Sequence, residues 1–511
     1  MPGPLEVKVE PRGPDPERVA AAAQAAVRDG ARLVGLRPLD AGAEPVPPES
    51  VQAALYDYEQ ERAVLVDVPL DGGGPTRVVE TSRQPLPGAD ELDTALAVVR
   101  EHAELGPAVR DGRLVPYRSM PPLAGEELPD GRVERVVSVG LAPASGDEGH
   151  EIVGVRLGRR EVVRYDSKAP PTSRAEARRC GIPNAGQGTV SSRAGAARIT
   201  VTQDGERLWR LIAVRPAASS GDMGSGVELR GVAYRGRGVL RRAHVPILNV
   251  RYDQNACGPY RDWQNEESRF KAQGAAVAPG FRLCPQPAET ILESRSDQGN
   301  FAGVAVYVDG QEVVLVSELA AGWYRYVSRW RLHADGTIKA RFGFGAVSNS
   351  CVCNVHHHHA YWRLDFDIGG AGDDVVLEHN DPPLAGHDGR WHTLSHEVRR
   401  SRNPGRKRRW RVRSQGDDAG YVLTPGANDG DADNYGVGDV WALRYRSSQI
   451  DDGAVATSTR AHLDAFVNGE SIVGTNLVLW YVGHFTHVTG HDQHAASGGH
   501  IVGPTLKPDR W

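Results

Sequence analysis

The chain is poor in cysteine and methionine and lacks any long apolar run. Its 511 residues include five cysteines and three methionines. So few cysteines, odd in number, do not indicate a disulfide framework. No apolar stretch approaches the roughly 18 residues that a membrane-spanning helix needs. We therefore expect no disulfide scaffold and no membrane partner.

The chain also lacks an overall basic charge and a recognisable leader. Its formal net charge is −5, which argues against a nucleic-acid partner. The N-terminal segment MPGPLEVKVEPRGPDPERV has no basic region followed by an apolar core. We therefore expect no secretory signal and a cytoplasmic location.

The composition is that of a globular chain, with 40% hydrophobic and 24% charged residues. Its length predicts two or three domains. Residues 1–80 are expected to form a small α/β domain. A helix pattern with proline near its start covers Pro16–Arg28, and strand-like runs follow at 53–56 and 63–69.

Residues 81–180 repeat this order and predict a second small α/β domain. Leu92–Leu105 is amphipathic, and strand-like runs follow at 133–141 and 151–157. The stretch 165–195 is polar and rich in Pro, Gly and Ser, as linkers and exposed loops are.

Residues 196–511 have a different pattern, in which short strands alternate with Gly, Asp, Asn and Pro turns. The clearest hairpin joins Tyr324–Leu332 to a second strand through the turn Asp335-Gly336. More than 300 residues of this pattern predict a large antiparallel β-sandwich, so the fold class is mainly β.

Four consecutive histidines open the segment HHHHAYWRLDFDI. Because strand side chains alternate between faces, His356 and His358 share a face with the apolar residues that follow, whereas His357 and His359 share the other. Two imidazoles on one buried face are well placed to bind one metal ion. The alternative is a surface histidine run with weak, adventitious metal affinity.

A second group of histidines lies near the C-terminus, and spacing alone does not choose among its members. A site of three histidines with open positions suits catalytic copper or zinc. The candidates for a third ligand are His484, His487, His491, His494 and His500.

Two motifs resemble copper amine oxidases. The run H-x-H-x-x-x-x-R-L-D, which begins at His356, resembles that family's copper-binding strand, and LVLWYVGHFTHV…GPTLKP resembles its closing segment. There, a Trp precedes the third copper histidine by seven residues, which places Trp480 at the Trp and His487 at the ligand. The resemblance covers about residues 200–511, and it implies copper bound by His356, His358 and His487. The two N-terminal units also resemble the family's two small domains.

The resemblance also implies a reaction. The family oxidises primary amines with dioxygen to aldehyde, ammonia and hydrogen peroxide, through a quinone (topaquinone) made from one of its own tyrosines. That tyrosine begins a strand leading into an Asp-Gly-Thr-Ile turn, here Asp335–Ile338, and Tyr324 stands at the matching distance. A homodimer is implied as well.

This chain departs from the family around both catalytic positions. The signature Thr-x-x-Asn-Tyr-Asp/Glu reads Ala320–Arg325 here, with Trp323 in place of Asn. The family's Val-Pro-Tyr motif matches Val250-Arg251-Tyr252. Counting on from that tyrosine, and back from the later glycines, gives the candidate bases Glu266 and Glu267, with Asp262 as a third. Alternatively, QNEESR is a solvated loop.

The sequence leaves open the role of two cysteines and the type of reaction. Cys351 and Cys353 either bind copper(I) during loading or pack as small hydrophobic residues. The chain as a whole is read first as an amine oxidase with a modified Tyr324. The alternatives are a copper enzyme without a quinone, which performs a different small-molecule oxidation, and a non-catalytic metal-binding descendant.

Overall fold

The computed structural model describes most of the chain, and everything below concerns these residues: 2–12, 16–28, 30–39, 50–69, 75, 77–81, 84–123, 126–127, 133–143, 151–165, 181–191, 193–255, 257–368, 370, 372–452, 463–488 and 500–511. Among them, no helix has the length and apolar character to cross a membrane.

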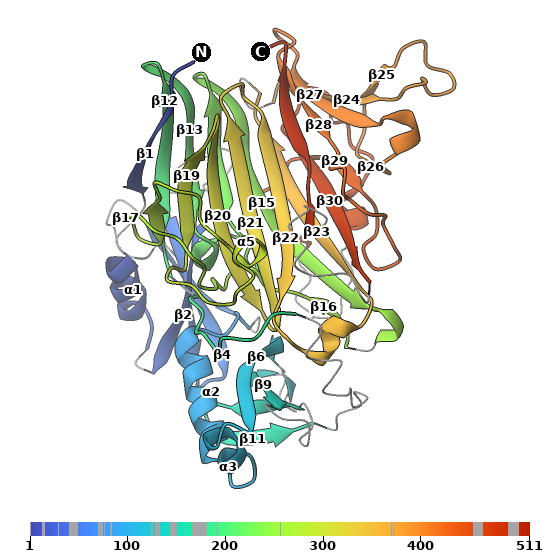
Figure 1. The fold of residues 1–511 in the computed structure, drawn as a ribbon. Helices are drawn as coiled ribbons and strands as arrows, with labels where there is room; N and C mark the ends of the chain where they lie inside the picture. Colours follow the sequence, from blue (N-terminus) through green and yellow to red (C-terminus); the bar gives the residue numbers. More distant parts are fainter. Residues whose placement is uncertain are drawn as a thin grey trace.

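Two large sheets pack face to face around one extensive core (Figure 1). The first has the order β1 (Leu5–Arg12), β12 (Ala196–Gln203), β13 (Glu206–Val214), β14 (Glu228–Tyr234), β15 (Arg237–Tyr252), β23 (His356–Phe366), β30 (Leu477–His487), β29 (Val440–Arg444) and β26 (Val398–Arg400), with β16 (Pro259–Arg261) paired to β15.

The second sheet carries the predicted hairpin. Its order is β17 (Ala275–Ala278), β18 (Phe281–Leu283), β19 (Val304–Asp309), β20 (Glu312–Ala321), β21 (Tyr324–His333), β22 (Ile338–Ala346), β32 (Thr505–Asp509), β28 (Gly420–Thr424), β27 (Arg409–Ser414), β24 (Asp374–His379) and β25 (Trp391–Leu394), with β31 (Ile501–Val502) paired to β22. Nearly all pairs are antiparallel, so the predicted mainly-β sandwich is confirmed.

Two small α/β units lie at the end of the sandwich opposite the chain termini (Figure 1). The first combines α1 (Pro16–Ala25) with the sheet β2 (Ala31–Leu39), β3 (Ser50–Asp57), β4 (Arg62–Pro69) and β5 (Arg77–Thr81). The second combines α2 (Ala89–Glu101) and α3 (Leu105–Arg110) with the sheet β11 (Glu161–Arg164), β10 (Glu151–Arg156), β9 (Val136–Pro143) and β6 (Leu114–Leu123), and β7 (Glu126–Glu127) pairs with β8 (Val133–Glu134). Each unit has a core of its own.

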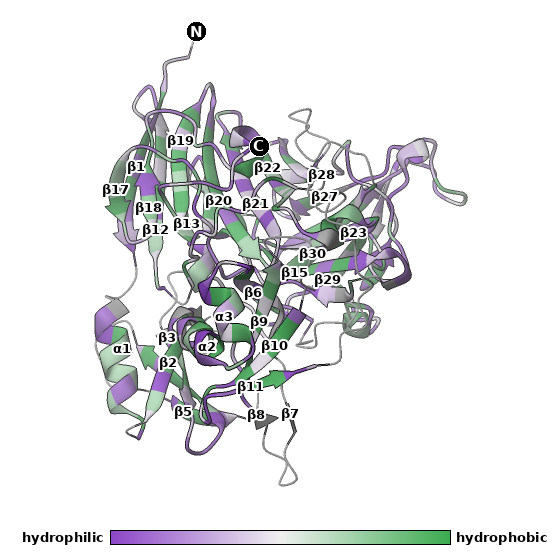
Figure 2. Cartoon of the chain, turned by 60° about the horizontal axis from the view of Figure 1, so that its bottom comes forward, coloured by the Kyte–Doolittle hydropathy of each residue, from purple (hydrophilic) through white to green (hydrophobic). Residues whose placement is uncertain are grey.

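The first strand does not belong to the unit that follows it in sequence. β1 pairs with β12 from Leu5↔Gln203 to Arg12↔Ala196, so residues 5–12 form an edge of the large sheet. The predicted linker 165–195 lies partly outside the described residues. The strands of the sandwich are largely hydrophobic and the loops hydrophilic, as burial of strand faces requires (Figure 2).

The histidine strand occupies the middle of the first sheet. β23 lies between β15 and β30, with His356 opposite Tyr252 on one side and opposite His487 on the other. The facing sheet presents β21, which begins at Tyr324. The topology therefore brings together residues that are far apart in sequence.

Candidate metal centre

The three predicted ligands lie on one buried face. His356 and His487 are register partners on β23 and β30, and His358 is two residues along the same face. All three are at most 4% exposed. The ring centroid of His356 lies 4.9 Å from that of His358 and 4.7 Å from that of His487. The prediction from strand alternation thus agrees with the arrangement of the strands.

Burial lowers the pKa of both His356 and His358, which favours the neutral form that binds metals. Burial, together with the neighbouring His487, lowers the pKa of His356 to about 3. The His356 Nδ1–H donates to the Asn354 carbonyl at 2.7 Å, which leaves Nε2 as the lone-pair atom. Still, no group of three or more His, Cys, Asp or Glu side chains in the described part of the chain is arranged closely enough to hold a metal ion as it stands. Copper binding stays a prediction.

Tyr324 lies against two of these histidines. Its ring centroid is 4.8 Å from that of His358 and 5.6 Å from that of His356, and the side chain is 1% exposed. Tyr326 stacks on it at 5.3 Å, because residues two apart on β21 share a face. Tyr326 was not predicted from the sequence as a residue of the site, although the pattern Tyr-Arg-Tyr on a strand could have indicated it.

A hydrogen-bond chain fixes the Tyr324 hydroxyl. The Trp323 indole N–H donates to the Tyr252 hydroxyl at 3.0 Å, and the hydroxyls of Tyr252 and Tyr324 are 2.6 Å apart. Burial raises the pKa of Tyr324 well above its ordinary value, although the bond from Tyr252 lowers it. Trp323 therefore contacts Tyr252 through its N–H, and its ring centroid lies 6.1 Å from that of Tyr324.

A carboxylate, Asp262, contacts this aromatic group through Tyr326. Tyr326 donates its hydroxyl to Asp262 Oδ2, and the same hydroxyl lies 3.4 Å from His358 Nδ1. Asp262 is fully buried, and no described residue forms a hydrogen bond with its Oδ1. Burial raises the pKa of Asp262 to about 7, although the bond from Tyr326 opposes this. An acid with these properties can accept a proton near neutral pH.

The two predicted glutamates face other partners. Glu266 forms an ion pair with Arg118 of β6 and accepts the Trp263 indole N–H at 3.2 Å. Glu267 accepts two N–H groups of Arg215, one at 2.8 Å, and a backbone N–H. Both glutamates are buried, so QNEESR is not a solvated loop. Because their oxygens are committed to arginines, Asp262 is the better candidate for the base.

The other C-terminal histidines that were candidates for the third ligand lie at different distances from this centre. His484 faces the opposite side of β30, where its Nδ1 lies 2.8 Å from that of His359. The His500 ring centroid is 6.3 Å from that of His487. His491 and His494 lie outside the described residues.

The expectation about cysteines is wrong. Cys257, which follows β15, forms a disulfide with Cys351, in the short 3-10 helix η3 (Ser350–Cys353) before β23. Cys353 is disulfide-bonded as well, and Cys284 is free and buried. Cys351 and Cys353 are therefore not copper(I) thiols. The Cys257–Cys351 bridge ties together the ends of the two strands that carry Tyr252 and His356.

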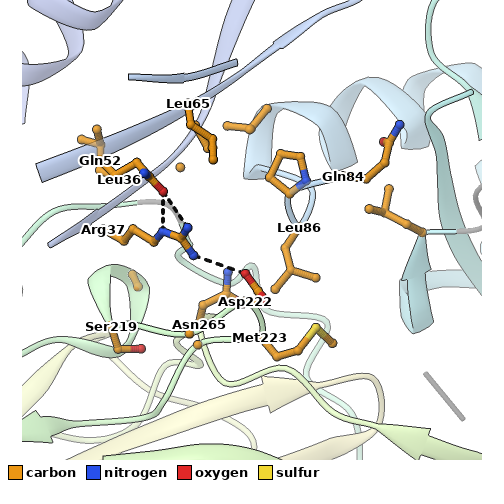
Figure 3. A pocket seen from close by; sticks show the side chains of 18 of the residues that line it. Leu36, Arg37, Gln52, Leu65, Gln84, Leu86, Ser219, Asp222, Met223 and Asn265 are labelled. Carbon is orange, nitrogen blue, oxygen red and sulfur yellow. Dashed lines mark hydrogen bonds and ion pairs between the residues drawn. The ribbon is translucent and has the colours of Figure 1, made fainter. Parts of the chain in front are cut away.

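A cavity of about 200 Å³ lies away from this centre, between the first small unit and the sandwich (Figure 3). Apolar side chains such as Leu36 and Leu65 form part of its wall. Arg37 crosses it and donates to Gln52 at 2.6 Å and to Asp222 at 3.4 Å. None of the predicted site residues lines it.

Neither a protein-family model nor a curated protein sequence matches the chain. Solved structures do. A copper-containing benzylamine oxidase from Hansenula polymorpha is 12% identical, with a TM-score of 0.59, over 98% of this chain and 97% of that one. An amine oxidase from Aspergillus nidulans is 13% identical, with a TM-score of 0.55, over 99% and 91%. A lysyl oxidase from Pichia pastoris is 11% identical, with a TM-score of 0.54, over 94% and 85%. The chain therefore has an amine-oxidase-like fold along nearly its whole length.

Proposed function

We propose that the chain is a copper-dependent oxidoreductase that converts a primary amine, dioxygen and water into aldehyde, ammonia and hydrogen peroxide. His356, His358 and His487 would hold the copper, and Tyr324 would be the quinone precursor. The observation that carries the proposal is the buried Tyr324 ring packed directly against two of the three histidines. Bound copper supplies the dioxygen chemistry, and a quinone made from Tyr324 supplies the carbonyl that reacts with the amine.

The other residues have separate tasks in this proposal. Tyr252 holds the Tyr324 oxygen through the 2.6 Å contact between their hydroxyls. Asp262 takes the proton from the substrate carbon, since its free Oδ1 is a buried acceptor. The rings of Tyr326 and Phe344 cover His358 and exclude water from it.

The test is chemical. The protein is purified, loaded with copper under air and treated with phenylhydrazine, while peroxide release is measured with a panel of primary amines. We expect quinone absorbance, a phenylhydrazine adduct and amine-dependent peroxide in the wild type, and none of these in Tyr324→Phe. The matched control is Tyr421→Phe, which removes another buried phenol, one that donates to the Gly336 carbonyl at 3.0 Å. A copper-loaded wild type that gives no adduct contradicts the proposal.

A second candidate is a copper enzyme that keeps Tyr324 unmodified. Trp323 favours it, because this bulky ring stands where the family has Asn and its N–H holds Tyr252 against Tyr324. The same samples separate the two. Copper-dependent oxidation of another small molecule without an adduct supports the second candidate, and bound copper without any oxidation supports a non-catalytic protein.

We also propose a homodimer, the commonest closed assembly of soluble chains, to be checked by light scattering. The cytoplasmic location stays a prediction. The Cys257–Cys351 disulfide weighs against it, because structural disulfides persist mainly in oxidising compartments.

A further inference from the structure

The outer face of the first sheet buries four arginines close together. Arg241 and Arg242 come from β15, Arg363 from β23 and Arg230 from β14, and none is more than 6% exposed. Arg230 is the register partner of Arg242, which in turn faces Asp365. This arginine cluster lies on the opposite side of β23 from His356 and His358, because Arg363 has the other strand parity.

Two of the arginines lie against a single ring. The guanidinium carbon of Arg241 is 4.6 Å from the ring centroid of Tyr445, and that of Arg363 is 5.4 Å from the same centroid. Stacking of this kind orients the planar groups and leaves their edges available for hydrogen bonds. The ring of Tyr445 therefore holds two cationic groups side by side.

Two carboxylates, Glu228 and Asp365, form ion pairs with this cluster within the described part of the chain. Glu228 pairs with Arg230 at 2.6 Å and with Arg242 at 3.3 Å, and Asp365 approaches Arg363 only to 3.6 Å. Repulsion within the cluster is visible in Arg242, where burial and then Arg363 lower the pKa to about 9.

Two of these arginines, Arg241 and Arg363, also have buried N–H groups that form no hydrogen bond with the described residues. Nη1 and Nη2 of Arg363 and Nε and Nη1 of Arg241 are buried and have no hydrogen-bond partner among the described residues. These four nitrogens carry seven N–H donors. An unsatisfied buried donor costs about 1–3 kcal/mol, so a set of this size calls for a bound group.

We propose that this cluster is a binding site for a phosphate-type oxyanion, either free or carried by a small molecule. Several oxygens on one tetrahedral group can accept from both guanidinium forks at once, which a carboxylate with two oxygens cannot do as fully. The anion also offsets the repulsion between the positive charges of Arg242 and Arg363. The histidine centre and this site lie on opposite faces of β23. The oxyanion would therefore bind without touching the groups that are proposed to be catalytic.

The test measures binding of inorganic phosphate to the full-length protein in chloride buffer, by calorimetry and by thermal shift. We expect one phosphate per chain, a melting temperature that rises with phosphate, similar behaviour with sulfate, and much weaker binding of acetate. Arg241→Gln and Arg363→Gln are expected to weaken phosphate binding by at least about tenfold, since each removes a charge-assisted fork.

Arg261→Gln is the matched control, because Arg261 is equally buried but has both Nη groups paired with Asp452, at 2.7 and 2.9 Å. Phosphate binding should survive this change. If the arginine variants fold poorly, Tyr445→Leu keeps every charge and removes only the ring, and it should also weaken binding. The proposal is overturned if the wild type binds no phosphate at millimolar concentration, or if Arg363→Gln and Arg261→Gln bind it equally. The first result would mean that water alone occupies the site. The phenylhydrazine reaction should be unaffected in all these variants.

Discussion

The two faces of the histidine strand are both buried and yet have opposite chemistry. On the inner face, His356 and His358 meet tyrosines, Phe344 and His487, and Asp262 is linked to His358 through Tyr326. On the outer face, His359 faces Asp433, and Arg363 faces Asp365. The comparison teaches that strand alternation sorts side chains into faces, while the segments that pack on each face decide what those side chains can do.

Neighbouring histidines on β23 give the sharpest test of this comparison. His358→Ala removes an inner-face ring, so we expect complete loss of the phenylhydrazine adduct and of bound copper at this centre. His359→Ala removes an outer-face ring and should leave both in place. Copper analysis and adduct absorbance on the two variants provide the measurement. An adduct that survives in His358→Ala, or vanishes equally in both, would break the distinction between the faces.

Asp262 is the candidate base on the inner face. Its replacement by a neutral residue is expected to have the next largest effect on activity. Asp262→Asn should lower kcat by about 10²–10⁴-fold, the usual contribution of a general base, while the adduct still forms. Because burial raises the pKa of Asp262 to about 7, kcat of the wild type should rise with pH and level off above that value. A base works in its ionised form, so activity is lost as the pH falls below about 7.

The pH profile of Asp262→Asn should lack this rise. Glu266→Gln is the control: it leaves the buried Arg118 without its ion pair and should lower stability by about 3–5 kcal/mol, with little change in the shape of the profile. If Glu266→Gln instead removed the rise, the base would be Glu266.

The disulfide is expected to matter for stability more than for chemistry. Cys257 and Cys351 are 94 residues apart in sequence, and loss of a bridge that closes a long loop typically costs about 2–4 kcal/mol. The paired double variant Cys257→Ser, Cys351→Ser should therefore unfold at lower denaturant concentration than the wild type. Since β15 and β23 are already joined from Leu240↔Phe366 to Tyr252↔His356, the adduct should still form. Loss of the adduct in a folded double variant would show that the bridge positions the site.

Local pattern predicted the inner face well and the outer face poorly. Alternation placed His356 and His358 inward, because that rule needs only the strand itself. It could not show that His359 is buried too, since the residues that cover it, such as Asp433, come much later in the chain. Counting from Tyr252 selected Glu266 and Glu267, but the arginines that engage them lie in β6 and after β13. The pairing of β1 with β12, across nearly 200 residues, left no local signal.

The smallest expected effect concerns the hydroxyl that holds Tyr324. Tyr252→Phe removes the acceptor of the Trp323 N–H and the 2.6 Å contact to Tyr324. One buried donor left without a partner costs about 1–3 kcal/mol, so stability should fall modestly. Tyr421→Phe removes a comparable buried hydrogen bond far from the histidines and should cost a similar amount. The two variants should then differ in chemistry alone: quinone formation is slowed in Tyr252→Phe, because the Tyr324 ring is no longer fixed, and is unchanged in Tyr421→Phe. Equal rates of quinone formation in both variants would mean that packing against His356 and His358 is enough to orient the Tyr324 ring. The hydrogen bond from Tyr252 would then not be needed for quinone formation.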